Sequence, residues 1–332
     1  MIRGVVVLMC LGLFLLPMFG RGAAVARDVD VSLSFAGLEP LATEHYEGWL
    51  VVGGVPVSTG KFTVAAGGAI QDLAGNPKST FRVPGVDLTV TTKFVLSIEP
   101  AGDTDAVPAA VKPLAGDLNP SKSAATLTAN LGKAFTGVSG KYILATPTDG
   151  AGTNEWGGVW FLDPTGPTMA PGLALPNLAG TDWTYEGWVV IGGKPVTTGR
   201  FDRVDAADGN APFSGSMTAP PFPGEDFLLN APTGLTFPPS LNSSKVVVSI
   251  EPRVDADPGP FQFKPLVGDT PAAATIMTPY ILGSSALATG AVAISPVPVA
   301  AQAAAADLTP WIVVLLVIVV AAVAVLMSRR RA

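Results

Sequence analysis

The sequence YEGWLVVGG at residues 46–54 recurs almost unchanged as YEGWVVIGG at residues 185–193. In both places the match continues, because PVSTGKF ends at Phe62 and PVTTGRF ends at Phe201. An apolar run, a Gly-Gly pair and a second run are typical of a β-hairpin, since a type I′ turn requires positive φ at both central residues. The duplicated stretch therefore predicts the same hairpin twice.

A second repeated block follows each hairpin. SIEP and then KPL occur within residues 93–114 and again within residues 245–266. The offset between the copies is 139 residues at the hairpin and 152 at this block, so the second copy has 13 extra residues between them. Two ordered blocks indicate a duplicated domain. Short strands and Gly/Pro turns predict an all-β fold of two tandem β-sandwich domains, which we place at residues 28–135 and 141–290.

Both ends of the chain carry the features of export and membrane anchoring. Residues 1–26 have the apolar run and the small-residue ending of a signal peptide. Residues 308–327 form an apolar stretch long enough to cross a bilayer as one helix, and the three arginines of the tail at 328–332 favour a cytoplasmic end. We expect a single-pass type I cell-membrane protein with an extracytoplasmic body and an Ala- and Pro-rich stalk at residues 291–307.

Charge and composition exclude several classes of protein. The chain has 20 basic and 26 acidic residues, and its net charge is −6. Such an acidic balance argues against nucleic-acid binding, which needs a basic surface. One His and one Cys argue against a disulfide, a His/Cys zinc site and most catalytic dyads. We therefore expect no enzyme activity, no cofactor and no catalytic residues, and a protein or envelope partner of unknown identity.

Several aromatic and acidic residues recur in both copies and form the repeated motif. They are Tyr46, Glu47, Trp49, Glu99, Tyr185, Glu186, Trp188 and Glu251. Paired glutamates across a cleft could hydrolyse glycosides, but a position beside strand ends in both copies favours a structural role. The Tyr and Trp of each motif are three residues apart and lie on opposite faces of a strand, so we expect the Trp in the core and the Tyr at the surface.

Possible metal ligands are few. A Gly-containing loop of the second copy is a calcium candidate, because Ca²⁺ prefers oxygen ligands, although its spacing departs from that of an EF-hand. Its residues are Asp202, Asp205, Asp208 and Asn210. We expect His45 to lie at the surface, since Thr184 takes its place in the second copy. We also expect solvated turns for the acids that follow each SIEP motif, which are Asp103, Asp105, Asp255 and Asp257.

The order of the repeated motifs resembles the C-terminal, extracytoplasmic domain of anti-sigma-K factors. The resemblance rests on a GW hairpin with GG and PV-TG-F, followed by a strand that ends in SIEP. The first copy carries these motifs at residues 49–62 and 97–100, and the second at 188–201 and 249–252. In that family a sigma-binding domain precedes the membrane helix, whereas here we expect a signal peptide. The resemblance therefore implies a sensing or protein-contact role and not direct inhibition of a sigma factor.

Taken together, these features predict a membrane-anchored extracytoplasmic module for protein contact or envelope sensing. One alternative is a carbohydrate- or calcium-dependent surface adhesin, which would use the repeated aromatic residues or the aspartate loop. Another is a glycan-modifying enzyme that uses the repeated glutamates.

Overall fold

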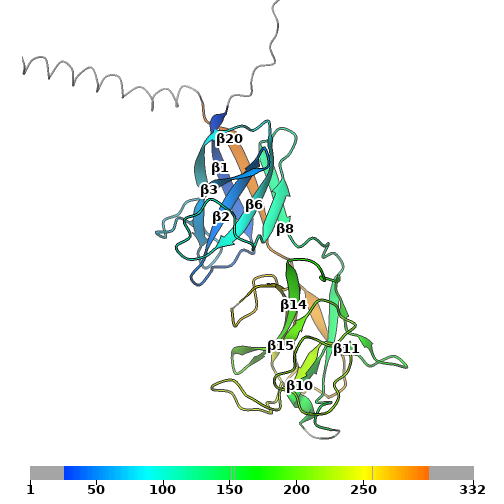
Figure 1. Cartoon of the computed structure of the whole chain (residues 1–332). Coiled ribbons are helices and arrows are strands. Elements are labelled where there is room, and N and C mark those ends of the chain that lie inside the picture. Colours follow the sequence, from blue (N-terminus) through cyan, green and yellow to red (C-terminus); the bar gives the residue numbers. More distant parts are fainter. Residues whose placement is uncertain (1–25, 151, 153, 256, 299–332) are drawn as a thin grey trace, which may run out of the picture.

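The computed structural model describes residues 26–298 apart from 151, 153 and 256. These residues form two all-β domains that lie end to end (Figure 1). Among the described residues, no helix is both long and apolar enough to cross a membrane. Residues 1–25 of the predicted signal peptide and the predicted membrane helix at 308–327 lie outside the described part of the chain.

Domain 1 is one antiparallel sheet of nine strands. The strands are β1 (Arg27–Ala36), β2 (His45–Val52), β3 (Val55–Val64), β4 (Ile70–Gln71), β5 (Thr80–Val86), β6 (Thr91–Glu99), β7 (Leu114–Asp117), β8 (Ala124–Ala129) and β20 (Thr289–Pro296). Their order is β4-β3-β2-β6-β7-β8-β20-β1-β5. β3 and β5, from opposite ends of this order, meet through the rings of Phe62 and Phe81 at 6.0 Å. The sheet therefore curls on itself around an aromatic core.

Domain 2 repeats this plan. Its strands are β9 (Ser139–Leu144), β10 (Gly158–Trp160), β13 (Leu173–Ala174), β14 (Trp183–Ile191), β15 (Lys194–Phe201), β16 (Gly224–Asp226), β17 (Lys245–Pro252), β18 (Leu266–Asp269) and β19 (Tyr280–Ser284). The order is β15-β14-β17-β18-β19-β9-β10-β16, with β13 on β9. A short 3₁₀ helix, η1 (Glu155–Gly157), precedes β10, while β11 (Leu162–Asp163) and β12 (Ala170–Pro171) pair separately.

The two predicted hairpins are confirmed as β2–β3 and β14–β15. In the first turn φ is 58° at Gly53 and 87° at Gly54, and the second turn repeats these positive values at Gly192 and Gly193. Side chains other than glycine rarely adopt this conformation. The glycine pairs therefore fix where each hairpin folds back.

A β-bulge in the first hairpin decides which side chains face each other. The register between β2 and β3 shifts between Gly48 and Trp49. On the opposite strand Gly60 has a φ of 122°, and a Cβ there would stand only 2.7 Å from a ring carbon of β5. Because of the shift, Glu47 faces Lys61. The second hairpin has the same bulge.

The last described strand returns to domain 1 and does not extend domain 2. β20 lies between β8 and β1, just as β9 lies between β19 and β13 in domain 2. Gly290 of β20 is opposite Leu127 of β8, and Gly140 of β9 is opposite Leu282 of β19. β20 and β9 therefore hold equivalent places. The strand that follows the first copy completes domain 2, and the strand that follows the second copy completes domain 1.

This exchange corrects two sequence-based boundaries. Domain 2 does not continue to residue 290, and residues 291–296 of the predicted stalk belong to β20. Val292 and Ile294 are buried while Ala291, Ala293 and Ser295 beside them are exposed, which is the alternation of a half-buried strand. The Ala- and Pro-rich composition concealed this alternation, because alanine fits either face. Domain 1 is therefore discontinuous, with domain 2 inserted between β8 and β20.

The two domains also touch through a loop at residues 253–265, between β17 and β18. Lys264 Nζ lies 3.0 Å from both carboxylate oxygens of Glu39 in domain 1. Gln262 Oε1 accepts hydrogen bonds from the Glu39 backbone N–H at 3.2 Å and from the Tyr46 hydroxyl at 3.3 Å. Polar contacts thus add to the two covalent connections between the domains.

Removing β20 should unfold domain 1 and spare domain 2. We compare a chain of residues 26–284 with a control of residues 26–298 by hydrogen exchange and mass spectrometry. The shorter chain should lose amide protection in β1 and β8, since each loses a partner strand, and should keep it in β14 and β17. Protection of β1 and β8 that equals the control would contradict the exchange of strands.

Candidate functional site

The strongest candidate site is a buried charged layer that recurs in both domains. In each it lies on the face of the hairpin opposite the apolar core and beneath the loop that follows the SIEP strand. We define the layer of domain 1 as His45, Glu47, Lys61, Glu99 and Asp103, under the loop at 100–113. The layer of domain 2 consists of Thr184, Glu186, Arg200, Glu251 and Asp255, under the loop at 253–265.

A hydrogen-bonded chain of Trp, Ser and Glu fastens the covering loop. Trp49 Nε1 donates to Ser97 Oγ at 2.8 Å, and the Ser97 hydroxyl donates to Glu99 Oε1. The same carboxylate oxygen accepts the backbone N–H of Ala109 in the loop at 2.9 Å. Domain 2 repeats the relay through Trp188, Ser249, Glu251 and the N–H of Phe261. The repeated Trp and SxE motifs thus have a structural role in both copies.

In domain 1 the charges of the layer meet at one lysine. Lys61 Nζ lies 2.8 Å from Asp103 Oδ2 and 3.6 Å from Glu47 Oε2. Burial raises the pKa of Glu47, against the effects of the Ser58 hydroxyl bound to its other oxygen and of the Lys61 charge. The hydrogen bond from Lys61 lowers the pKa of Asp103. Lys61 is therefore held mainly by Asp103 and reaches Glu47 less closely.

In domain 2 an arginine takes the place of Lys61 and pairs with the acids of the layer. Arg200 Nε lies 2.6 Å from Glu186 Oε2, and its Nη2 lies 3.1 Å from Asp255 Oδ2. A planar guanidinium presents several fixed donors and can bind two carboxylates at once. Glu186 and Asp255 are consequently both paired with Arg200 at hydrogen-bond distance, while Glu251 belongs to the relay.

The repeated aromatic residues are buried, which corrects the expected surface position of the tyrosines. Tyr46 and Tyr185 are fully buried and belong to the apolar core. Their hydroxyls donate to the backbone carbonyls of Glu39 at 2.7 Å and Pro176 at 2.8 Å. Trp49 is also buried, but it lies on the opposite face, under the loop. The four aromatic side chains are thus inaccessible for stacking on a sugar.

His45 and two of the turn acids also differ from expectation. His45 is only 6% exposed, and burial lowers its pKa. The side chains of Asp103 and Asp255 are each 12% exposed and pair with Lys61 and Arg200. Asp105 and Asp257 are exposed, as predicted. The covering loop accounts for the difference, because it brings one acid of each pair inward.

The calcium candidate is not assembled. Asp202 pairs with Arg253 at 3.1 Å, and Asp205 pairs with Arg203 at 2.6 Å. Asp208 instead accepts the backbone N–H of Gly224 at 3.0 Å, and Asn210 is exposed. Within the described part of the chain these four residues form no cluster of converging ligands. Neighbouring arginines neutralise two of the three carboxylates that Ca²⁺ would need.

Two buried acids of domain 2 were missed by the sequence analysis. Glu225 and Asp226 on β16 are both fully buried. Asp226 accepts Trp160 Nε1–H at 2.6 Å and the backbone N–H of Thr148 at 2.7 Å. Glu225 accepts the Ser214 hydroxyl through one oxygen, while its other oxygen has no hydrogen-bond partner among the described residues. Adjacent acids in a Pro- and Gly-rich stretch are typical of a surface loop, so no sequence signal marked them.

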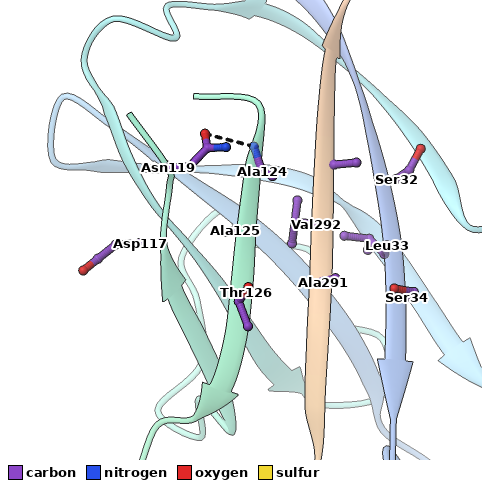
Figure 2. A pocket seen from close by; sticks show the side chains of 11 residues that line it. Ser32, Leu33, Ser34, Asp117, Asn119, Ala124, Ala125, Thr126, Ala291 and Val292 are labelled. Atoms are coloured by element: carbon purple, nitrogen blue, oxygen red, sulfur yellow. Dashed lines mark hydrogen bonds between the residues drawn. The ribbon is translucent and has the colours of Figure 1, made fainter. Parts of the chain in front are cut away.

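Figure 2 shows an open hollow over β8, β20 and β1. Its volume is about 630 Å³. Most of its lining side chains are small, namely Ser32, Ser34, Ala124, Thr126, Ala291 and Ala293. The hollow brings no titratable cluster together, so the buried layer is the stronger candidate.

Comparison with protein-family models, with curated proteins and with solved structures finds no match. The resemblance to the exterior domain of anti-sigma-K factors therefore stays a prediction. The residues that carry it do have a defined place, because they build the hairpin and the relay of each domain.

Ser97→Ala should destabilise domain 1, because it leaves Trp49 Nε1–H and the Glu99 carboxylate without their shared partner. We expect the free energy of unfolding to fall by about 1–3 kcal/mol in urea denaturation followed by circular dichroism. Ser34→Ala, at an exposed position, is the control and should change little. Equal stability of the two variants would show that the relay contributes nothing.

The buried acids should make the protein less stable as the pH rises. Burial raises the pKa of Glu225 to about 8 and the pKa values of Asp208 and Glu251 to about 7. These groups bind protons more tightly when folded than when unfolded, so their stabilising effect is complete below about pH 4 and is lost towards about pH 8.

We expect the free energy of unfolding to decrease from pH 5 to pH 8, by an amount on the order of 1–3 kcal/mol. Glu225→Gln cannot ionise and should show a smaller decrease. Urea denaturation at a series of pH values measures both chains. A stability that rises over this interval would contradict the assignment of these acids as buried and neutral.

Proposed function

We propose that the chain is a membrane-anchored extracytoplasmic module that holds domain 2 outward for contact with a protein or envelope partner. The position of the two chain ends carries this proposal. β1 and β20 pair from Val29 opposite Pro296 to Ala36 opposite Thr289. Both ends of the described chain consequently leave domain 1 on the side away from domain 2 (Figure 1).

This arrangement suits a protein attached through the segment at residues 308–327. Domain 1 would then lie next to the membrane and domain 2 would be the outer domain. Only a short connection separates β20 from that segment, so domain 1 would stay near the bilayer. The resemblance to the exterior domain of anti-sigma-K factors supports a sensing or contact role for such an outer domain.

The surface of domain 2 supports a protein partner. The described residues include twelve exposed large apolar side chains, and eight of these lie in domain 2, namely Trp156, Met169, Met217, Leu229, Val254, Ile276, Met277 and Ile281. Trp156 is 43% exposed, and its Nε1–H is bound to the Ala274 carbonyl at 2.9 Å. It lies in η1, directly before β10, which is at the end of domain 2 remote from domain 1 (Figure 1). Rigidly held tryptophans are frequent at the centres of protein interfaces.

The alternative functions have weaker support. The repeated glutamates are tied into the relay or paired with the cation of the layer, which leaves them poorly placed to act on a glycan. The repeated aromatic residues are covered, and the aspartates of the calcium candidate are dispersed. We therefore rank protein contact above adhesion through sugar or calcium and above glycan hydrolysis.

In-cell photocrosslinking tests the proposal. A photoreactive amino acid replaces Trp156 of the anchored chain in one strain and the exposed Ser34 of domain 1 in another, and captured proteins are identified by mass spectrometry. We expect a specific partner from position 156 only. A captured membrane regulator or membrane protease would support signalling. Capture of envelope polymer or a surface-layer protein alone would contradict signalling and leave an envelope contact, while identical products from both positions would contradict contact through domain 2.

A further inference from the structure

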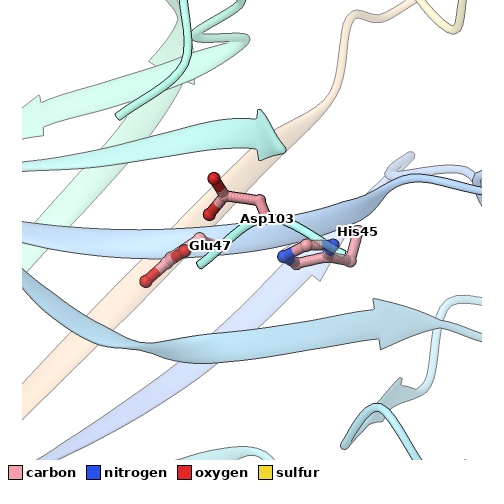
Figure 3. Close-up of side chains that lie close together, drawn as sticks. All are labelled: His45, Glu47 and Asp103. Carbon is pink, nitrogen blue, oxygen red and sulfur yellow. The ribbon is translucent and has the colours of Figure 1, made fainter. Parts of the chain in front are cut away.

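His45, Glu47 and Asp103 bring three possible metal ligands together in domain 1. One ligand atom from each residue lies within 4.8 Å of the other two. Figure 3 shows the His45 ring turned towards the two carboxylates. The histidine and glutamate come from β2, and the aspartate comes from the loop that covers the strand. The hairpin thus supplies two of the three ligands and the covering loop supplies the third.

Two atoms of this cluster are buried without a hydrogen bond. His45 is 6% exposed and Glu47 is 2% exposed. Among the described residues, His45 Nε2 and Glu47 Oε2 have no hydrogen-bond partner, and the nearest cation to the latter is Lys61 at 3.6 Å. Buried polar atoms are normally hydrogen-bonded, and an unpartnered one calls for an explanation such as an ion.

Domain 2 shows how the two acids that correspond to Glu47 and Asp103 are paired when an arginine takes the place of the lysine, although Glu251 Oε2 has no hydrogen-bond partner among the described residues. Arg200 reaches both Glu186 and Asp255, and Thr184 replaces the histidine. Domain 1 differs in two ways that both favour a metal. It has an imidazole in place of a hydroxyl, and it has a lysine that bridges the acids less completely than the arginine does.

We propose that His45 Nε2, Glu47 Oε2 and Asp103 Oδ2 bind a divalent transition metal ion of the Zn²⁺ type. Imidazole and carboxylate ligands suit Zn²⁺ at distances of about 2.0–2.2 Å, so the three ligand atoms, which now lie within 4.8 Å of one another, would move closer together around the ion. The second oxygen of Glu47 is already held by the Ser58 hydroxyl, and Asp103 Oδ1 accepts the Asp105 N–H at 3.4 Å. Such outer contacts orient ligands towards a metal.

The metal replaces the Lys61 ammonium. Lys61 is 22% exposed, and its long side chain can turn to solvent when a doubly charged ion takes its place between the acids. A metal with two carboxylates is electrically neutral, whereas one ammonium leaves a net negative charge. Arg200 is held by two short ion pairs and is harder to displace, so we assign the site to domain 1 alone.

Co²⁺ provides a direct probe, because its visible absorption reports tetrahedral coordination. The full chain is purified without a polyhistidine tag and titrated with Co²⁺, and Zn²⁺ is then added as a competitor. We expect one equivalent of Co²⁺ to bind with a tetrahedral spectrum, and Zn²⁺ to abolish that spectrum. His45→Thr, which introduces the residue of domain 2, should weaken binding by at least about 10-fold.

Three further variants separate the site from adventitious binding. Glu47→Gln should weaken Co²⁺ binding, while Glu186→Gln, the same change at the equivalent position of domain 2, should not. Lys61→Met should bind Co²⁺ more tightly than the unchanged chain, since the competing ammonium is gone. Circular dichroism checks that each variant is folded. Binding that is absent from the unchanged chain, or unaffected by His45→Thr, would overturn the proposal.

Discussion

The ladder that β20 forms with β1 and β8 is the constraint on which the arrangement of the molecule depends. Without this strand the first sheet would separate into two parts, each with an unpaired edge, and the core would lose Val292 and Ile294. Because β20 follows domain 2 in the chain, the first sheet can be completed only by a segment that lies beyond the whole second copy. The same ladder places the two ends of the described chain side by side. The domain order, the inserted second domain and the outward direction of its far end all follow from it.

Within each domain, the buried layer shows how one backbone accepts two arrangements of charge. A buried carboxylate is unfavourable unless a cation or several donors accompany it. The bulge places a basic residue opposite the first glutamate in both copies, and the covering loop adds an aspartate. A forked guanidinium satisfies both acids in domain 2, whereas a single ammonium satisfies one acid well in domain 1. The histidine therefore lies next to the less completely paired of the two layers.

Local signals in the sequence were sufficient for the hairpins and the principal strands, because glycine pairs and apolar runs act over a few residues. The pairing of Glu47 with Lys61 was within reach, since both copies keep a basic residue there, but an unbulged hairpin would have placed Gly60 opposite Glu47. Features that depend on contacts between distant parts of the chain could not be predicted from the sequence. The buried position of His45 depends on a loop fastened more than 60 residues away in sequence, and β20 is recognised only by the strands that it joins.

The two copies differ from each other in two regions. Where each region lies can be related to the way each domain is connected in the chain. Domain 2 has the 13 extra residues between hairpin and SIEP strand, and this region carries β16 with its buried acid pair and contributes exposed apolar side chains such as Met217 and Leu229. Domain 1 keeps the shorter connection, and its change lies inside the layer, where histidine and lysine replace threonine and arginine. An inserted domain can vary its outer loops freely, because both of its connections lie at the end that faces domain 1. Domain 1 is constrained at one end by domain 2 and at the other by the chain ends. Residues with a new chemical role are therefore most easily introduced in its interior layer.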